Sequence, residues 1–140
     1  MDETAYYLPL GKPGEHRYEP TRATESPWDT KAQHGGPPTA LLAHVLAENP
    51  EGRRLARISV DFFGPIPRRG FSIEVSPLKP GRLTMLNEAR IMVDGRAAVT
   101  ARAWHIATGP QPPAITPRQT PPPLPGPVEQ RFFTGIGSWG

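Results

Sequence analysis

The chain is 140 residues long, carries a net charge of +3 at neutral pH, and contains 20 prolines and no cysteine. This length is enough for one domain with a single hydrophobic core. The lack of cysteine excludes disulfides, thiolate metal sites and a cysteine nucleophile.

The charged and apolar residues follow a pattern typical of a cytoplasmic protein. No apolar run reaches the roughly 18 residues of a membrane span. The first residues, Met-Asp-Glu-Thr, lack the basic stretch of a secretory signal. The arginines cluster only as pairs, without the interleaved aromatic residues of single-strand binders. We therefore expect a cytoplasmic protein that contacts neither membranes nor nucleic acid.

The clearest helix of the chain is expected directly after residues 33–38, Gln-His-Gly-Gly-Pro-Pro. Proline suits the first turn of a helix, because its missing N–H would have no partner there. The larger apolar residues recur with helical spacing at Pro38, Leu41, Leu42, Val45 and Leu46. Alanines line the opposite side, at Ala40, Ala43 and Ala47. This pattern predicts a helix that is packed on both faces.

Alternation of apolar and polar residues predicts strands around the helix. Two short strands are expected near residues 4–8 and 16–20. Four longer strands, joined by tight turns, are expected at residues 56–63, 71–76, 83–93 and 97–107. No helix lies between the later strands, so a parallel βα architecture is excluded. We predict an α+β hotdog fold over residues 1–108, in which a curved antiparallel sheet wraps around one central helix.

The composition changes after residue 108. Nine prolines fall between Pro110 and Pro127, which indicates a linker of polyproline II character over residues 109–127. A ligand for SH3-like domains is the alternative interpretation of this linker. Residues 128–133 alternate like a new strand, and we interpret residues 128–140 as the first strand of a truncated second hotdog.

Five short segments recur in an order that resembles a known family. They are Trp28-Asp29, Gln33-His34-Gly35-Gly36, the run from Val60 to Pro67, Lys79-Pro80-Gly81-Arg82 and Asp94-Gly95-Arg96. Over roughly residues 20–107 they look like the N-terminal hotdog of the double-hotdog, acyl-CoA thioesterase-like family. The resemblance implies hydrolysis of an acyl thioester to a free acid and coenzyme A, with the acyl chain near the helix and no cofactor. It also implies that two hotdog units pair side by side into one continuous sheet.

The glycine pair is the predicted carbonyl-binding turn. A helix N-terminus offers unpaired N–H groups and a positive dipole end, which suit a developing oxyanion. Because the following prolines have no N–H, the donors are Gly35, Gly36 and Thr39. Gln33 either bonds a substrate carbonyl or caps the loop. The alternative to a binding role is a structural one, in which the two glycines only allow a tight turn into the helix.

The catalytic candidates are His34 and Asp61. His34 either orients the glycine loop or touches the thioester. Asp61 lies on the polar face of its strand, away from the helix, which favours a solvated or interface carboxylate over a catalytic base. Arg82, on a Pro-Gly turn, is a candidate for the coenzyme A phosphates. No cluster of metal ligands is visible in the sequence.

The catalytic base is the open point. Single-hotdog thioesterases with His-Gly-Gly place an acid nine positions after that histidine, and here Ala43 occupies this position. The alternative to hydrolysis is therefore a non-catalytic module for acyl binding or dimerisation, and a third class is an interaction protein that uses its Pro-rich tail. We expect a homo-oligomer, because an isolated hotdog leaves a sheet edge unpaired.

Overall fold

A computed structural model describes residues 5–48, 52–114 and 120–126. The chain divides into two units, Met1–Thr108 and Gly109–Gly140. In the second unit, the described residues 109–114 and 120–126 are exposed and form neither helix nor strand. The strand expected at residues 128–133 lies outside the described residues.

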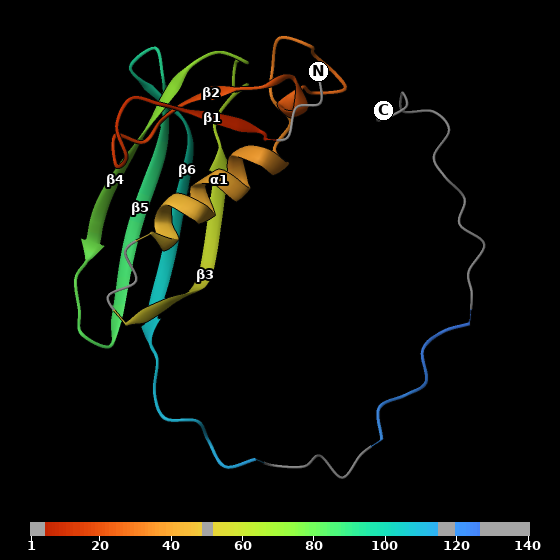
Figure 1. The fold of residues 1–140 in the computed structure, drawn as a ribbon, viewed down its shortest axis with the longest axis vertical. Helices are drawn as coiled ribbons and strands as arrows, with labels where there is room; N and C mark the ends of the chain where they lie inside the picture. The colour runs from red at the N-terminus through yellow and green to blue at the C-terminus, as the bar shows by residue number, and fades with distance from the viewer. Residues whose placement is uncertain (1–4, 49–51, 115–119, 127–140) are drawn as a thin grey trace. The chain divides into compact units, whose positions relative to one another are not determined.

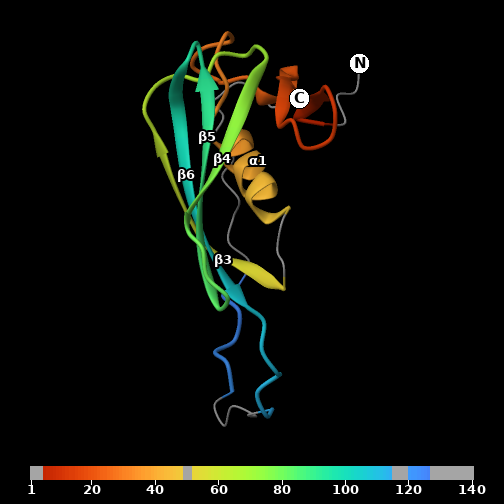
Figure 2. The same ribbon diagram turned by 90° about the vertical axis from the view of Figure 1, so that its left-hand side faces the viewer.

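The first unit is a six-stranded antiparallel sheet with one α-helix on one face (Figures 1 and 2). The strands are β1 (Tyr7–Leu10), β2 (Arg17–Pro20), β3 (Arg53–Phe62), β4 (Phe71–Lys79), β5 (Thr84–Val93) and β6 (Arg96–Ala107). A single 3₁₀ turn, η1 (Arg22–Thr24), follows β2. The predicted α+β hotdog fold is confirmed.

Helix α1 (Gly36–Ala47) lies across one face of the sheet, as the side view in Figure 2 shows. Its large apolar side chains are buried against the sheet, and the core they form also contains Ile73, Ala89, Ile91, Val99, Ala101 and Ala103. The expectation of burial on both helix faces is wrong for this chain. Ala40 and Ala47 are exposed and Ala43 is half-buried, because a single sheet covers only one side of the helix.

The strand order in space differs from the order along the chain. The sheet runs β1-β2-β4-β5-β6-β3, so β3 pairs with β6 and is separated from β4 by two strands. The expected tight turn between these consecutive strands is therefore wrong. Residues 63–70 instead cross from one side of the sheet to the other, and this crossover segment contacts the loop that precedes α1.

Strand β3 forms one edge of the sheet and contains an irregularity. The register to β6 shifts between Leu55 and Arg57. Leu55, Ile58 and Val60 pack against the core, whereas Ala56 is exposed. The simple alternation expected from Ala56 to Phe62 is thus broken by a bulge that places Leu55, not Ala56, on the inner face.

Candidate functional site

The start of α1 presents two backbone donors. Gly35 is the N-cap residue and has helical torsion angles, φ −71° and ψ −20°. Among the described residues, neither the Gly35 nor the Gly36 amide has a hydrogen-bond acceptor. Pro37 and Pro38 have no N–H to offer. Thr39 is already engaged, because its amide (3.3 Å) and its hydroxyl (2.8 Å) both donate to the Gly35 carbonyl.

The glycines keep the space above these amides open. Neither residue has a positive φ, so backbone conformation does not require glycine here. A Cβ atom on Gly35 would lie 3.4 Å from Cζ of Phe62, and one on Gly36 would lie 3.3 Å from Cε1 of His34. The imidazole of His34 and the ring of Phe62 therefore flank the turn, and both glycines are exposed. Because both glycines are exposed, we expect a small acceptor group to reach their amides.

The loop before the glycines is held from two sides. On one side, the His34 amide donates to the Thr24 carbonyl (2.9 Å). On the other, the Gln33 amide donates to the carbonyl of Ile66 in the crossover segment (2.8 Å). The Gln33 side chain donates from Nε2 to the Pro67 carbonyl (3.0 Å) and accepts at Oε1 from the Tyr7 hydroxyl (2.7 Å). Gln33 thus caps the loop, and only 7% of its surface is exposed.

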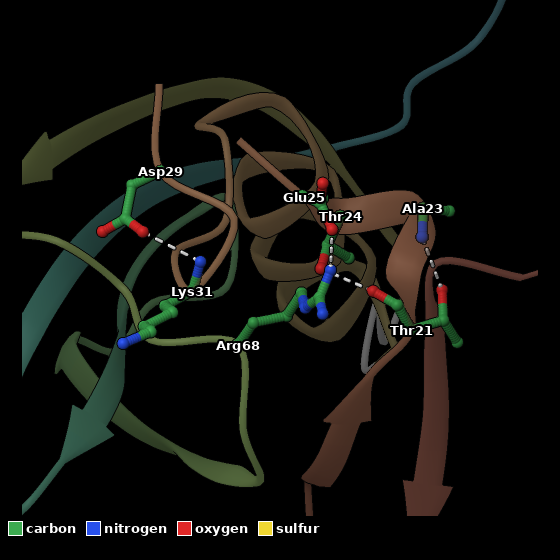
Figure 3. A network of polar contacts seen from close by, with 7 residues as sticks. All are labelled: Thr21, Ala23, Thr24, Glu25, Asp29, Lys31 and Arg68. Carbon is green, nitrogen blue, oxygen red and sulfur yellow. Dashed lines mark hydrogen bonds and ion pairs between the residues drawn. The ribbon is translucent and has the colours of Figure 1, made fainter. Parts of the chain in front are cut away.

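A second set of contacts braces the outside of this loop (Figure 3). Arg68 of the crossover forms an ion pair with Glu25, and its amide donates to the Lys31 carbonyl (2.8 Å). The Lys31 amide in turn donates to the carboxylate of Asp29 (2.9 Å). In the figure, Arg68 lies between the turn of Asp29 and Lys31 and the segment that contains Thr21, Thr24 and Glu25. The glycine turn is therefore mounted on a braced loop.

Two of the candidate residues lie apart from the glycine turn. Asp61 is exposed and alternates with the inward-facing Val60, so its side chain is on the sheet face opposite α1. Arg82 is exposed in the β4–β5 turn, where its carbonyl accepts from Nε of Arg53 at the start of β3 (3.3 Å). Phe62, beside Gly35, ends the same strand. Arg82 and the glycine turn are therefore separated by the length of β3, about 30 Å at the usual rise per residue.

Among the ionisable groups with shifted pKa values, one contacts the loop before the glycine turn and one lies on the outer face of the sheet. Burial raises the pKa of Tyr7 above its usual range, so its hydroxyl keeps its proton at physiological pH. On the outer face of the sheet, hydrogen bonds from Arg102 and Arg90 lower the pKa of Glu88. Within the described part of the chain, no group of three or more metal-ligating side chains could hold a metal ion.

Sequence reasoning missed the residues that hold the turn. Tyr7 and Pro67 lie far from Gln33 in the sequence, and only the folded arrangement brings β1 and the crossover to the loop. The sequence carried no signal for Tyr7, because its neighbours Tyr6 and Leu8 are also apolar and the strand does not alternate. In the structure Tyr7 packs on the inner face together with Tyr18 and Phe71. Their rings pack edge to face and tilted, at centroid distances of 5.7–6.4 Å.

The profile of a family described as "Acyl-CoA thioesterase N-terminal domain" matches residues 24–106. No curated protein sequence matches the chain. Within the described residues, no helix is long and apolar enough to cross a membrane.

Solved structures share the fold. A candidate thioesterase II from Thermobifida fusca YX is 25% identical over 80% of this chain and 42% of its own, with a TM-score of 0.58. The Escherichia coli PaaI protein from the phenylacetic acid degradation operon is 16% identical over 66% of this chain and 70% of its own, with a TM-score of 0.57. A Bacillus halodurans protein solved with CoA is 15% identical over 64% of both chains, with a TM-score of 0.54. The chain thus spans less than half the length of the Thermobifida protein.

Proposed function

Since the chain belongs to the acyl-CoA thioesterase family, we propose that it hydrolyses an acyl thioester of coenzyme A to a free acid and coenzyme A. One observation carries the proposal: two adjacent amides, Gly35 and Gly36, are without an acceptor in the described structure at the N-terminus of a helix. Amides in this position are suited to stabilise the oxyanion of an acyl-transfer reaction. The CoA in the Bacillus halodurans structure supports the choice of thioester.

In the proposed reaction, the thioester carbonyl oxygen accepts hydrogen bonds from the Gly35 and Gly36 amides. A water molecule attacks the carbonyl carbon and gives a proton to the imidazole of His34, which flanks Gly36. The C–S bond then breaks, and His34 returns the proton to the departing sulfur of coenzyme A. The acyl chain lies along α1 and beside Phe62, whose exposed fraction of 47% is large for a phenylalanine. Histidine is the side chain used most often for such proton transfer.

The test is acyl-CoA hydrolysis, followed by detection of the free thiol on substrates from short to long chains. We expect hydrolysis by the wild type and a loss of about 100-fold in His34→Ala. His44→Ala is the matched control, because the side chain of His44 is 70% exposed on α1, after the glycine turn, and lies 3.5 Å from the Glu48 carboxylate. Binding of acyl-CoA by calorimetry without thiol release would instead support the non-catalytic module. Activity at background on all chain lengths would refute hydrolysis by this chain.

We also propose that two copies pair through β3. In the sheet of the described residues, this strand has a neighbour on one side only, and unpaired edges attract further strands. Arg57, Ser59 and Asp61 are exposed on its outer face. In an antiparallel pair centred on Ser59, Arg57 of each copy lies opposite Asp61 of the other, and opposite charges in this position stabilise a sheet. The proposal gives Asp61 the role of an interface carboxylate.

Sedimentation at micromolar concentration tests this pairing. We expect a dimer for the wild type, a shift towards monomer for Arg57→Glu, and recovery of the dimer in the charge swap Arg57→Glu/Asp61→Arg. A monomeric wild type would contradict the proposal, as would a charge swap that stays monomeric. The cytoplasmic location expected from the sequence stays a prediction.

A further inference from the structure

We propose that Tyr7 is a positioning residue for the glycine turn: its hydroxyl fixes the side-chain amide of Gln33, and Gln33 holds the turn in place to receive a carbonyl oxygen. The inference deepens the proposed function and rests on it, because the turn has a catalytic meaning only if it binds a thioester. Tyr7 comes from β1, 26 residues before Gln33 in the sequence. Tyr7 would act through Gln33 and not by touching the reacting atoms.

The orientation of the Gln33 amide is determined by its partners. The Pro67 carbonyl only accepts hydrogen bonds, so the NH₂ group of Gln33 must face it, at 3.0 Å. The oxygen of Gln33 then faces Tyr7, whose hydroxyl donates at 2.7 Å. A tyrosine hydroxyl carries its proton at neutral pH and can donate, and burial raises the pKa of Tyr7 further. Both ends of the Gln33 side chain are therefore held by the protein.

The position of Gln33 affects the glycine turn through the backbone, because only His34 lies between them. Its own amide is bonded to Ile66, and the amide of the next residue, His34, is bonded to Thr24. Gly35 and Gly36 follow directly. If the Gln33 side chain loses Tyr7, its oxygen is left buried without this donor, and the loop must shift to satisfy it. The first atoms to move are those of the residues that carry the two proposed donors.

Tyr18 provides a matched control. Its ring belongs to the same aromatic cluster, with centroids 6.4 Å from Tyr7 and 6.2 Å from Phe71. In the described part of the chain its hydroxyl has no hydrogen-bond partner. Tyr7→Phe and Tyr18→Phe thus remove the same atom from neighbouring rings, but only the first change removes a bond to the loop. A general effect of losing a hydroxyl from this cluster would appear in both variants.

The experiment records amide resonances by NMR together with steady-state kinetics on the full chain. We expect the Gly35 and Gly36 amide signals to shift in Tyr7→Phe and to stay in place in Tyr18→Phe. In the same comparison, kcat falls about 10-fold in Tyr7→Phe while KM changes less than twofold. Gln33→Met removes both side-chain bonds, and adding Tyr7→Phe to it should change the signals no further, because the two residues act through one contact.

The two readouts separate the possible failures. A wild type without hydrolysis refutes the proposed function, while the amide signals still decide whether Tyr7 positions the turn. Glycine signals that do not move in Tyr7→Phe, or that move equally in Tyr18→Phe, overturn the positioning role. Additive shifts in Tyr7→Phe and Gln33→Met overturn the path through Gln33. If Tyr7→Phe does not fold, a Gln33→Met variant that leaves the glycine signals unchanged also overturns it.

Discussion

Substitution of Gly36 by alanine should affect the free energy of unfolding and the hydrolytic activity in opposite directions. Alanine favours a helix over glycine by about 1 kcal/mol, and Gly36 is the first residue of α1 and lacks a positive φ. The new methyl group would lie 3.3 Å from Cε1 of His34. This contact is tight, and it requires the half-buried His34 to give way by a few tenths of an ångström. We expect the free energy of unfolding to change by between 0 and about +1 kcal/mol.

Activity should change in the opposite direction. We expect the methyl group to hinder a carbonyl oxygen that approaches the two amides, so kcat/KM should fall about 10- to 100-fold. Urea unfolding and thiol release would be measured on the same samples. Gly64→Ala is the control, because a Cβ there meets nothing within 4 Å and φ is not positive. A Gly36→Ala variant with full activity would refute the binding turn, and one destabilised by more than about 1 kcal/mol would refute the steric estimate.

Two further changes test stability. The pKa of Glu88 is lowered, first by its hydrogen bond from Arg102, so its contribution to stability is present above the unfolded value of 4.5 and is lost as the pH falls through the lower folded value. Glu88→Gln should cost about 1–2 kcal/mol in urea unfolding at pH 7 and should reduce this loss in acid. His105 is fully buried, and its Nε2 bonds the Leu46 carbonyl at 2.8 Å near the end of α1. His105→Ala should cost about 2–4 kcal/mol in the same assay, and His105→Gln, which keeps a donor, should recover part of it; equal losses in both variants would argue against the bond.

Local patterns in the sequence were enough to predict the elements. The helix begins where two prolines occupy its first turn, and its buried residues are those with helical spacing. The Asp94-Gly95 pair joins β5 and β6, with both residues at positive φ as such a hairpin turn requires. These features depend on residues close together in the chain, and for this reason they could be recognised without a structure.

The arrangement of the site could not be predicted in the same way. Nothing near residues 62 and 71 indicates that β3 and β4 lie apart in the sheet, since each is an ordinary half-buried strand. The crossover between them supplies the carbonyls of Ile66 and Pro67 that hold Gln33. The alanines of α1 gave a wrong prediction for a different reason. Alanine is the best helix former and is found both buried and exposed, so its presence on a helix face does not show whether that face is covered. The outer side of α1 was therefore expected to be covered.

The place of β3 at the sheet edge has a consequence for the growing chain during translation. Among the described strands, β3 pairs with β6 alone, and the ribosome makes β6 roughly 40 residues later, which corresponds to about 2–8 s at usual rates of synthesis. Until then β3 lacks the strand beside which it lies in the described sheet, although α1, which packs against its apolar face, is already made. The edges of β3 are meanwhile open to other nascent chains. Arg54, which takes no part in the proposed Arg57–Asp61 pairing, lies beside the bulge, and a charge and a bulge on an edge strand both disfavour unspecific pairing. These two features thus shield β3 until β6 is made.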